Sequence, residues 1–192
     1  MAPVVKLGGR RQRPGTGRQM TIDPKAWERH LKLQDGRAIY VRPIRPEDER
    51  LYGGLFAQET AEDLRRRFFA PVKAFSHEFV SRFTHIDYAK AMAFIALEEG
   101  SGEMLGVARL HDNADGDSGE YAILVRSDLK HHGLGWQLMQ MIVAYARAKR
   151  LRRIEGKVLR DNSPMLDMCR EMGFEIGTDP DEPYVCKVTL SL

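Results

Sequence analysis

Cysteine is scarce in this chain, which has 2 cysteines among its 192 residues. So few cysteines argue against a disulfide-rich scaffold. Cys169 falls in a predicted helix and Cys186 in a predicted strand, so we interpret both as reduced packing residues. Long apolar runs are also absent, and none approaches the roughly 20 residues needed to cross a bilayer. We therefore expect a cytoplasmic protein without a membrane partner.

Two common phosphate-binding motifs are missing as well. No segment fits the P-loop pattern GxxxxGK[ST]. The dinucleotide pattern GxGxxG is incomplete, because Leu138 occupies the position of the third glycine. Any phosphate-bearing ligand must therefore be held by another arrangement.

Acidic residues are absent from the first 20 positions, which hold five basic residues. The other positions carry 25 basic and 27 acidic residues, so the net charge of +3 comes from the N-terminal segment. With little apolar content, residues 1–20 are predicted to be a disordered basic arm. Such an arm could contact nucleic acid or a membrane, but we favour a solvated extension. Residues 21–192, in a chain that is 43% hydrophobic, are expected to form one domain.

The most informative segment that is present is Lys130-His131-His132-Gly133-Leu134-Gly135. It lies between an apolar run, Tyr121–Val125, and apolar residues at helical spacing in 135–149. Glycines let the backbone approach a ligand, and a helix N-terminus offers free N–H groups and a positive dipole. The main-chain amides from His131 to Trp136 are thus a predicted seat for a pyrophosphate.

The remaining pattern predicts an α/β fold with a mixed sheet of about six to seven strands. An antiparallel meander precedes a β-α-β unit, with helices on both faces. A short helix is expected from Asp23 to Leu33. The other expected helices are 46–58, 60–69, 76–84, 135–149 and 163–172, and the expected strands are 38–43, 91–97, 104–110, 119–125, 153–159 and two closing strands.

These residues resemble the GNAT acetyltransferase family. The family pattern is [RQ]-x-x-G-x-[GA], then a helix, a strand, an Asn and a Gly-Phe pair. This chain has the same order and spacing in Lys130-x-x-Gly133-x-Gly135, Asn162 and Gly173-Phe174, with Lys130 at the [RQ] position. Within that family the chain is similar to bacterial protein lysine acetyltransferases that modify acyl-CoA synthetases. Segments 42–48, 67–69, 86–88 and 120–129 carry this second likeness, and the resemblance covers about residues 37–190.

The resemblance implies a GNAT-like fold and acetyl-CoA as co-substrate. The pantetheine arm would bond to the strand at Leu124 and Val125, and Asn162 would contact it or cap the next helix. Lys130 replaces the usual Arg or Gln and keeps a cation near phosphate. The predicted coenzyme-binding residues are therefore Leu124, Val125, Lys130, His131, His132, Gly133, Leu134, Gly135, Trp136 and Asn162.

Glu120 is the predicted general base. A free lysine amine has a pKa of about 10.4, so deprotonation near pH 7 costs about 4.6 kcal/mol and needs a proton acceptor. Glu120 begins the strand that should hold the thioester, and it matches the glutamate base of the similar lysine acetyltransferases. An apolar setting would raise its pKa. Three other glutamates are weaker alternatives: Glu98, Glu99 and Glu103.

The remaining groups of residues are given no catalytic or metal-binding role. Many family members have a general-acid tyrosine where this chain has Cys169, which we interpret as a packed thiol. His131-His132 lacks a further ligand, so no metal site is predicted. Residues 113–124 do not complete a calcium loop. Arg65 to Arg67 are expected on a mixed helix face, and Phe68-Phe69 in the core.

Three functions remain open at this point. The favoured one is acetyl transfer to a protein lysine, with an acyl-CoA synthetase as the implied partner. The alternatives are an acetyltransferase for a small amine, such as a polyamine or an antibiotic, and a non-catalytic acetyl-CoA sensor or nucleic-acid-binding protein. Nucleic acid is not the expected partner, and the oligomeric state is open.

Overall fold

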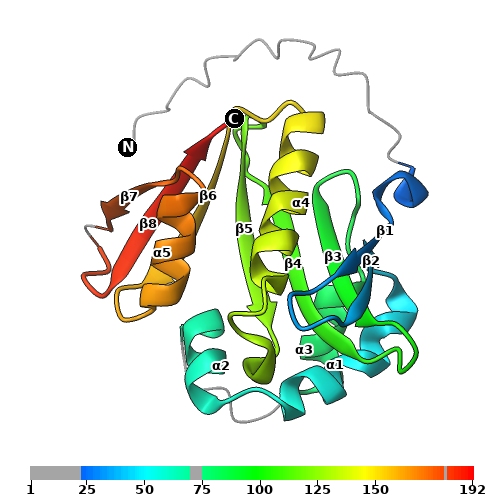
Figure 1. Ribbon diagram of the computed structural model, residues 1–192. Coiled ribbons are helices and arrows are strands. Elements are labelled where there is room, and N and C mark those ends of the chain that lie inside the picture. The colour runs from blue at the N-terminus through cyan, green and yellow to red at the C-terminus, as the bar shows by residue number, and fades with distance from the viewer. Residues whose placement is uncertain (1–22, 70–74, 180) are drawn as a thin grey trace, which may run out of the picture.

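The computed structural model describes residues 23–69, 75–179 and 181–192, so the arm predicted over residues 1–20 lies outside the described residues. An eight-stranded sheet runs through the chain in the order β1-β2-β3-β4-β5-β6-β8-β7 (Figure 1). Every neighbouring pair is antiparallel except β5 and β6. The mixed sheet is confirmed, with eight strands rather than six to seven. The strands are β1 (Arg29–Lys32), β2 (Ala38–Pro43), β3 (Ala91–Glu98), β4 (Met104–Asp112), β5 (Ser118–Val125), β6 (Arg153–Leu159), β7 (Glu175–Thr178) and β8 (Val185–Ser191).

Helices cover both faces of the sheet, as predicted (Figure 1). Strand β3 shows why, because it is buried on both sides: Phe94 packs into the cluster under the helices at 134–148 and 163–171, whereas Ile95 packs into the cluster under the helices at 49–57, 61–68 and 77–84. No helix within the described ranges is long and apolar enough to cross a membrane. The helices are α1 (Glu49–Ala57), α2 (Ala61–Phe68), α3 (His77–Thr84), α4 (Leu134–Ala148) and α5 (Ser163–Glu171), with single 3-10 turns at Pro24–Trp27, Pro46–Asp48 and Ser127–Leu129.

Short polar side chains set three helix starts. The Thr60 hydroxyl accepts a bond of 3.1 Å from the N–H of Asp63, and Ser76 caps α3 in the same way. The Asn162 carbonyl accepts from the N–H of Met165 at 3.4 Å. Each cap satisfies an N–H group that has no acceptor within the helix.

The helix predicted from Asp23 to Leu33 was wrong. Asp23 caps only one 3-10 turn, and the chain then forms β1 against β2 through a turn at Gly36, whose φ is +93°. Leu31 and Leu33 are two residues apart, and both pack against the core. A two-residue spacing places both side chains on one face of a strand. Pairing with β2 therefore outweighed the helix-start signal of Asp23-Pro24.

The parallel pair β5–β6 separates soon after it begins. Pairing covers only Ser118 to Glu120 of β5 against Arg153 to Glu155 of β6. Beyond that point β6 remains paired with β8, whereas β5 remains paired with β4 alone. The main-chain groups of β5 beyond Glu120 are therefore left without a strand partner on the β6 side, where an extended ligand could bind them.

Candidate active site

A cleft of about 910 Å³ opens where β5 and β6 part. Its walls come from β5, the segment leading into α4, the start of α5 and helix α2. Glu120 and all the predicted coenzyme-binding residues except Leu134 line it. The Leu134 side chain is fully buried in the core beneath α4, so this residue can offer the cleft only its main chain.

The N-terminus of α4 has the features of an anion seat. Gly133 adopts a left-handed conformation with φ at +88°, and so does His131 at +66°. Among the residues that the structure describes, no side chain caps the helix, and its first turn has no acidic residue. The first intrahelical bond runs from the N–H of Gln137 to the carbonyl of Gly133 at 3.1 Å. The earlier amides of that turn are free to bind an anion.

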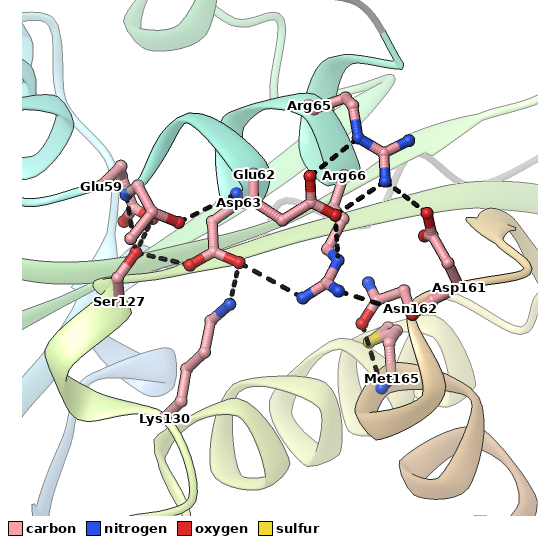
Figure 2. A network of polar contacts seen from close by, with 11 residues as sticks. Glu59, Glu62, Asp63, Arg65, Arg66, Ser127, Lys130, Asp161, Asn162 and Met165 are labelled. Carbon is pink, nitrogen blue, oxygen red and sulfur yellow. Dashed lines mark hydrogen bonds and ion pairs between the residues drawn. The ribbon is translucent and has the colours of Figure 1, made fainter.

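Lys130 lines this seat, but its ammonium group contacts the Asp63 carboxylate of α2 (Figure 2). Asp63 is buried, and its other carboxylate oxygen accepts a bond of 2.6 Å from Ser127. Burial opposes ionisation of Asp63, but the bonds from Lys130 and Ser127 hold its pKa below the usual value. The Lys130 side chain therefore links α2 to the start of α4, and its ammonium group is already engaged rather than free to bind a phosphate.

Glu59 extends this polar network on the other side of Ser127. The Ser127 hydroxyl lies 3.0 Å from a carboxylate oxygen of Glu59, while the second oxygen is buried and has no hydrogen-bond partner among the described residues. Burial raises the pKa of Glu59 to about 7, and the nearby Ser127 hydroxyl, whose single proton is shared with the closer Asp63 carboxylate, offsets only part of that rise. The network therefore contains a group that titrates near neutral pH.

Helix α2 reaches both sides of the cleft (Figure 2). Asp63 contacts the segment before α4, whereas Arg65 contacts Asp161 in the connection from β6 to α5. Arg66 donates to the main-chain carbonyl of Asp161 at 3.5 Å and lines the cleft. Arg65 and Arg66 thus lie on a mixed polar face of α2, as the sequence predicted, whereas Arg67, which was expected on the same face, lies among aromatic side chains instead.

Glu120 lies on the face of the sheet that α1, α2 and α3 cover, together with its i+4 neighbour Leu124. Its side chain is exposed to the cleft, so the apolar burial expected around it is absent before substrates bind. Within the described residues, no hydrogen bond or ion pair engages the Glu120 carboxylate. The carboxylate is free to accept a proton from an amine in the cleft.

Strand register sets the neighbours of Glu120. His111 of β4 lies opposite it, and Glu155 of β6 is its parallel partner. The Glu155 carboxylate is engaged by Lys187 at 2.8 Å and by Asn113 at 2.9 Å. The three alternative glutamates do not line the cleft: Glu98, Glu99 and Glu103 contact Ser101, His30 and Arg126, respectively.

Cys169 is a packed thiol, as the sequence predicted. It is fully buried, and its Sγ lies 3.3 Å from the Tyr121 hydroxyl. Burial raises the pKa of Cys169 and also that of Tyr121. Cys169 does not line the cleft, and Cys186 is a buried free cysteine in β8.

The adjacent residues His131 and His132 have different surroundings. His131 is exposed, whereas His132 is half-buried with Nδ1 at 3.5 Å from Asp35. Across the described ranges, no group of three potential ligands is placed to hold a metal ion. In residues 113–124, which were not expected to form a calcium loop, Asp115 accepts hydrogen bonds from the main-chain N–H and the hydroxyl of Ser118.

Sequence reasoning missed what α2 and β4 contribute to the site. Arg66 and Arg67 line the cleft, and His111 faces Glu120 across the β4–β5 pair. The prediction that Phe69 is a core residue was wrong, because its side chain is 41% exposed and its φ is +59°. His111 and Glu120 are each two residues outside Asn113 and Ser118, the pair that closes the turn, and this spacing was the one available signal for their register.

An anion seat at a helix start, an opening between parallel strands and a free carboxylate are features that could serve acyl transfer from a thioester that carries a diphosphate. The model of the acetyltransferase (GNAT) family matches residues 57–174, and this chain belongs to that family. It is therefore an acetyltransferase by family, and its fold is the GNAT fold.

Individual relatives agree with this assignment. An acetyltransferase of Pseudomonas aeruginosa is 29% identical over 152 residues, which cover 78% of this chain and 82% of that protein. Acetyltransferase Pat of Mycolicibacterium smegmatis is 26% identical over 74% of this chain, but the match spans only 43% of that protein. The crystal structure of the GNAT domain of S. lividans PAT superposes with a TM-score of 0.81 at 28% identity, covering 89% of this chain and all of that domain.

Proposed function

We propose that this chain transfers an acetyl group from acetyl-CoA to the ε-amine of a protein lysine, and that an acyl-CoA synthetase is the protein modified. One observation carries the proposal: a single cleft joins the free amides at the start of α4 to the free carboxylate of Glu120. Similarity to Pat of M. smegmatis and to the GNAT domain of S. lividans PAT supports the choice of acceptor.

The residues present fit acetyl-CoA. The diphosphate would lie on the amides from His131 to Trp136, where the helix dipole and the absence of an acid favour an anion. The amide-rich pantetheine would bond to the main chain of Leu124 and Val125, which has no strand partner on the β6 side. Asn162 already caps α5, and its side chain also lines the cleft.

Glu120 would accept the proton that the attacking amine must lose. The amine nitrogen forms a bond to the thioester carbon, the carbon–sulfur bond breaks, and the proton goes to Glu120 directly or through one water. The released thiolate takes a proton from solvent, because the structure places no free acid where the family places a tyrosine. Acetylation removes the lysine charge and can alter the activity of the target.

The test is transfer of labelled acetyl from acetyl-CoA to a panel of acceptors. Acyl-CoA synthetases and other lysine-containing proteins form one half, and polyamines and aminoglycosides form the other. We expect label on a lysine of an acyl-CoA synthetase. Label on small amines alone would reject the protein-lysine proposal and favour the small-amine alternative.

Glu120→Gln should abolish most turnover while acetyl-CoA binding, measured by calorimetry, stays within about threefold. The expected loss is 100-fold or more, on the order of the contribution of a positioned general base. Glu99→Gln is the matched control, because Glu99 lies outside the cleft. Unchanged turnover in Glu120→Gln would remove this residue as the base.

A further inference from the structure

Two arginines lie side by side beneath the reaction centre. Arg109 of β4 is the register partner of Ala122 in β5, two residues beyond Glu120, and Arg67 approaches from α2. Both side chains line a small cavity of about 10 Å³ on the face of the sheet that α1 to α3 cover. That volume suits one water-sized group.

Neither arginine forms an ion pair with a carboxylate, although the charge of Glu120 favours the charged form of Arg67 from beyond ion-pair distance. The described ranges contain every Asp and Glu of the chain, and none of them forms an ion pair with Arg67 or Arg109. Arg109 donates to the Phe83 carbonyl at 2.5 Å, and its guanidinium lies 5.0 Å from the centre of the Phe83 ring. Arg67 lies 5.0 Å from the centre of the Phe68 ring.

Two unpaired cations in an aromatic setting are costly. Burial lowers the pKa of both guanidinium groups, and the charge of Arg109 lowers the pKa of Arg67 further. Buried charges in proteins are normally paired, because removing an unpaired ion from water costs several kcal/mol. Aromatic faces offset part of that cost, but they leave the forked donors of both arginines suited to a carboxylate.

The small cavity adjoins the substrate cleft. Arg67, Ala122 and Leu124 line both spaces, so a group in the cleft near Ala122 lies beside the small cavity that both guanidinium groups line. Ala122 lies between the anion seat at α4 and the base Glu120, which is the stretch of β5 where the thioester would lie under the proposed function. The position is adjacent to both the acyl group and the acceptor amine.

We propose that Arg67 and Arg109 form a subsite for a carboxylate of the substrate. Two sources share this chemistry: the far end of a dicarboxylic acyl group carried by CoA, or an acidic group beside the acceptor amine. The transfer step is unchanged, since the amine still displaces the thiolate and the carboxylate is held without reacting. The inference rests on the proposed binding of acyl-CoA in the cleft.

The first arm of the test measures dissociation constants by calorimetry for acetyl-CoA and succinyl-CoA. The variants are Arg67→Met, Arg109→Met and the control Arg82→Met, which alters an exposed arginine of α3. A carboxylate on the acyl group predicts that each cleft variant weakens succinyl-CoA relative to acetyl-CoA by about tenfold or more, as expected for a charged hydrogen bond.

The second arm uses two lysine peptides that differ only in a Glu or Gln beside the lysine. A carboxylate on the acceptor predicts that the wild type binds the Glu peptide more tightly in the presence of CoA, and that this preference disappears in Arg67→Met and Arg109→Met. The Arg82→Met control should keep the preference. This arm separates the two sources.

Thermal melting excludes a folding defect, because removing an unpaired buried charge should leave the melting temperature unchanged or raise it. Absence of any carboxylate preference in both arms, with acetyl-CoA bound normally, would overturn the subsite alone. Failure of the wild type to bind either thioester would instead overturn the proposed function.

Discussion

The ring of Tyr121 lies against the main chain of Gly156, at the point where β5 and β6 separate. A Cβ on Gly156 would come within 2.7 Å of the ring atom Cε1 of Tyr121. Pairing of the two strands ends one residue earlier on each strand, at Glu120 and Glu155. The buried Tyr121 side chain, whose hydroxyl lies 3.3 Å from Cys169, therefore occupies space that a side chain on β6 would need.

Gly156→Ala should destabilise the fold by about 1–3 kcal/mol, the range for adding a methyl group to a packed region. Gly177→Ala in β7 is the control, because its nearest contact would be an ordinary 3.8 Å. Denaturant unfolding of Gly156→Ala, Tyr121→Leu and the double variant gives the coupling. Strictly additive losses would contradict direct contact between the two residues.

Glu59 makes stability depend on pH in a defined direction. Its pKa is raised to about 7 in the fold by burial, so the folded state holds a proton that the unfolded state releases between about pH 4.5 and 7. Stability from this group is complete at low pH and is lost as pH rises through that window. Above pH 7 the fold contains a partly desolvated carboxylate.

Glu59→Gln should therefore be more stable than wild type at pH 8, by about 1–3 kcal/mol after allowance for partial exposure, and nearly equal at pH 5. Melting curves at both pH values measure the difference. Glu175→Gln, an exposed change on β7, should show no such dependence. A gap between Glu59→Gln and wild type that is constant with pH would contradict this account of Glu59.

Lys130 is expected to support the fold as well as the cleft. Lys130→Met removes the ammonium group in contact with the buried Asp63 carboxylate and leaves only Arg66, 3.7 Å away, as its cationic partner, so we predict a loss of about 1–3 kcal/mol in unfolding free energy. Lys130→Arg should recover most of it. Equal stability of the methionine variant and wild type would show that the contact with Asp63 contributes little.

Much of the fold follows from local patterns in the sequence. The strands Ala38–Pro43 and Arg153–Leu159 are found where they were predicted, and α2 begins after the cap predicted at Thr60. Apolar runs, turn residues and caps are local signals, so they survive in the tertiary structure. The segment from Asp23 to Leu33 shows the limit, because its pairing partner β2 decides its conformation.

The candidate site was likewise predictable only where its residues are contiguous in the chain. The turn before α4 and the strand before it were readable, because the glycines, the strand and the helix are contiguous in the chain. The parts from α2 were not, because Asp63 and Lys130 are 67 positions apart and meet only through the packing of α2 on β5. Arg109 was missed for a similar reason, since only the β4–β5 register places it beside Ala122.

The two glycines before and within α4 should respond differently to substitution. Gly133→Ala forces alanine to a φ of +88°, at a cost of about 1–2 kcal/mol, and should turn the amides away from the anion. Gly135→Ala adds a methyl group with ordinary contacts of 3.8 and 3.9 Å, and the family pattern accepts alanine there. We expect loss of stability and of CoA affinity in Gly133→Ala alone. Similar behaviour of the two variants would contradict a conformational role for Gly133.

The central claim is that the start of α4 binds the diphosphate of acetyl-CoA. Calorimetry of the wild-type chain with acetyl-CoA and with S-acetylpantetheine, which lacks the diphosphate together with the adenosine 3′-phosphate, tests it directly. We predict one molecule of acetyl-CoA bound per chain, and at least tenfold weaker binding of S-acetylpantetheine. Equal affinity for the two compounds, or no binding of acetyl-CoA, would contradict the account.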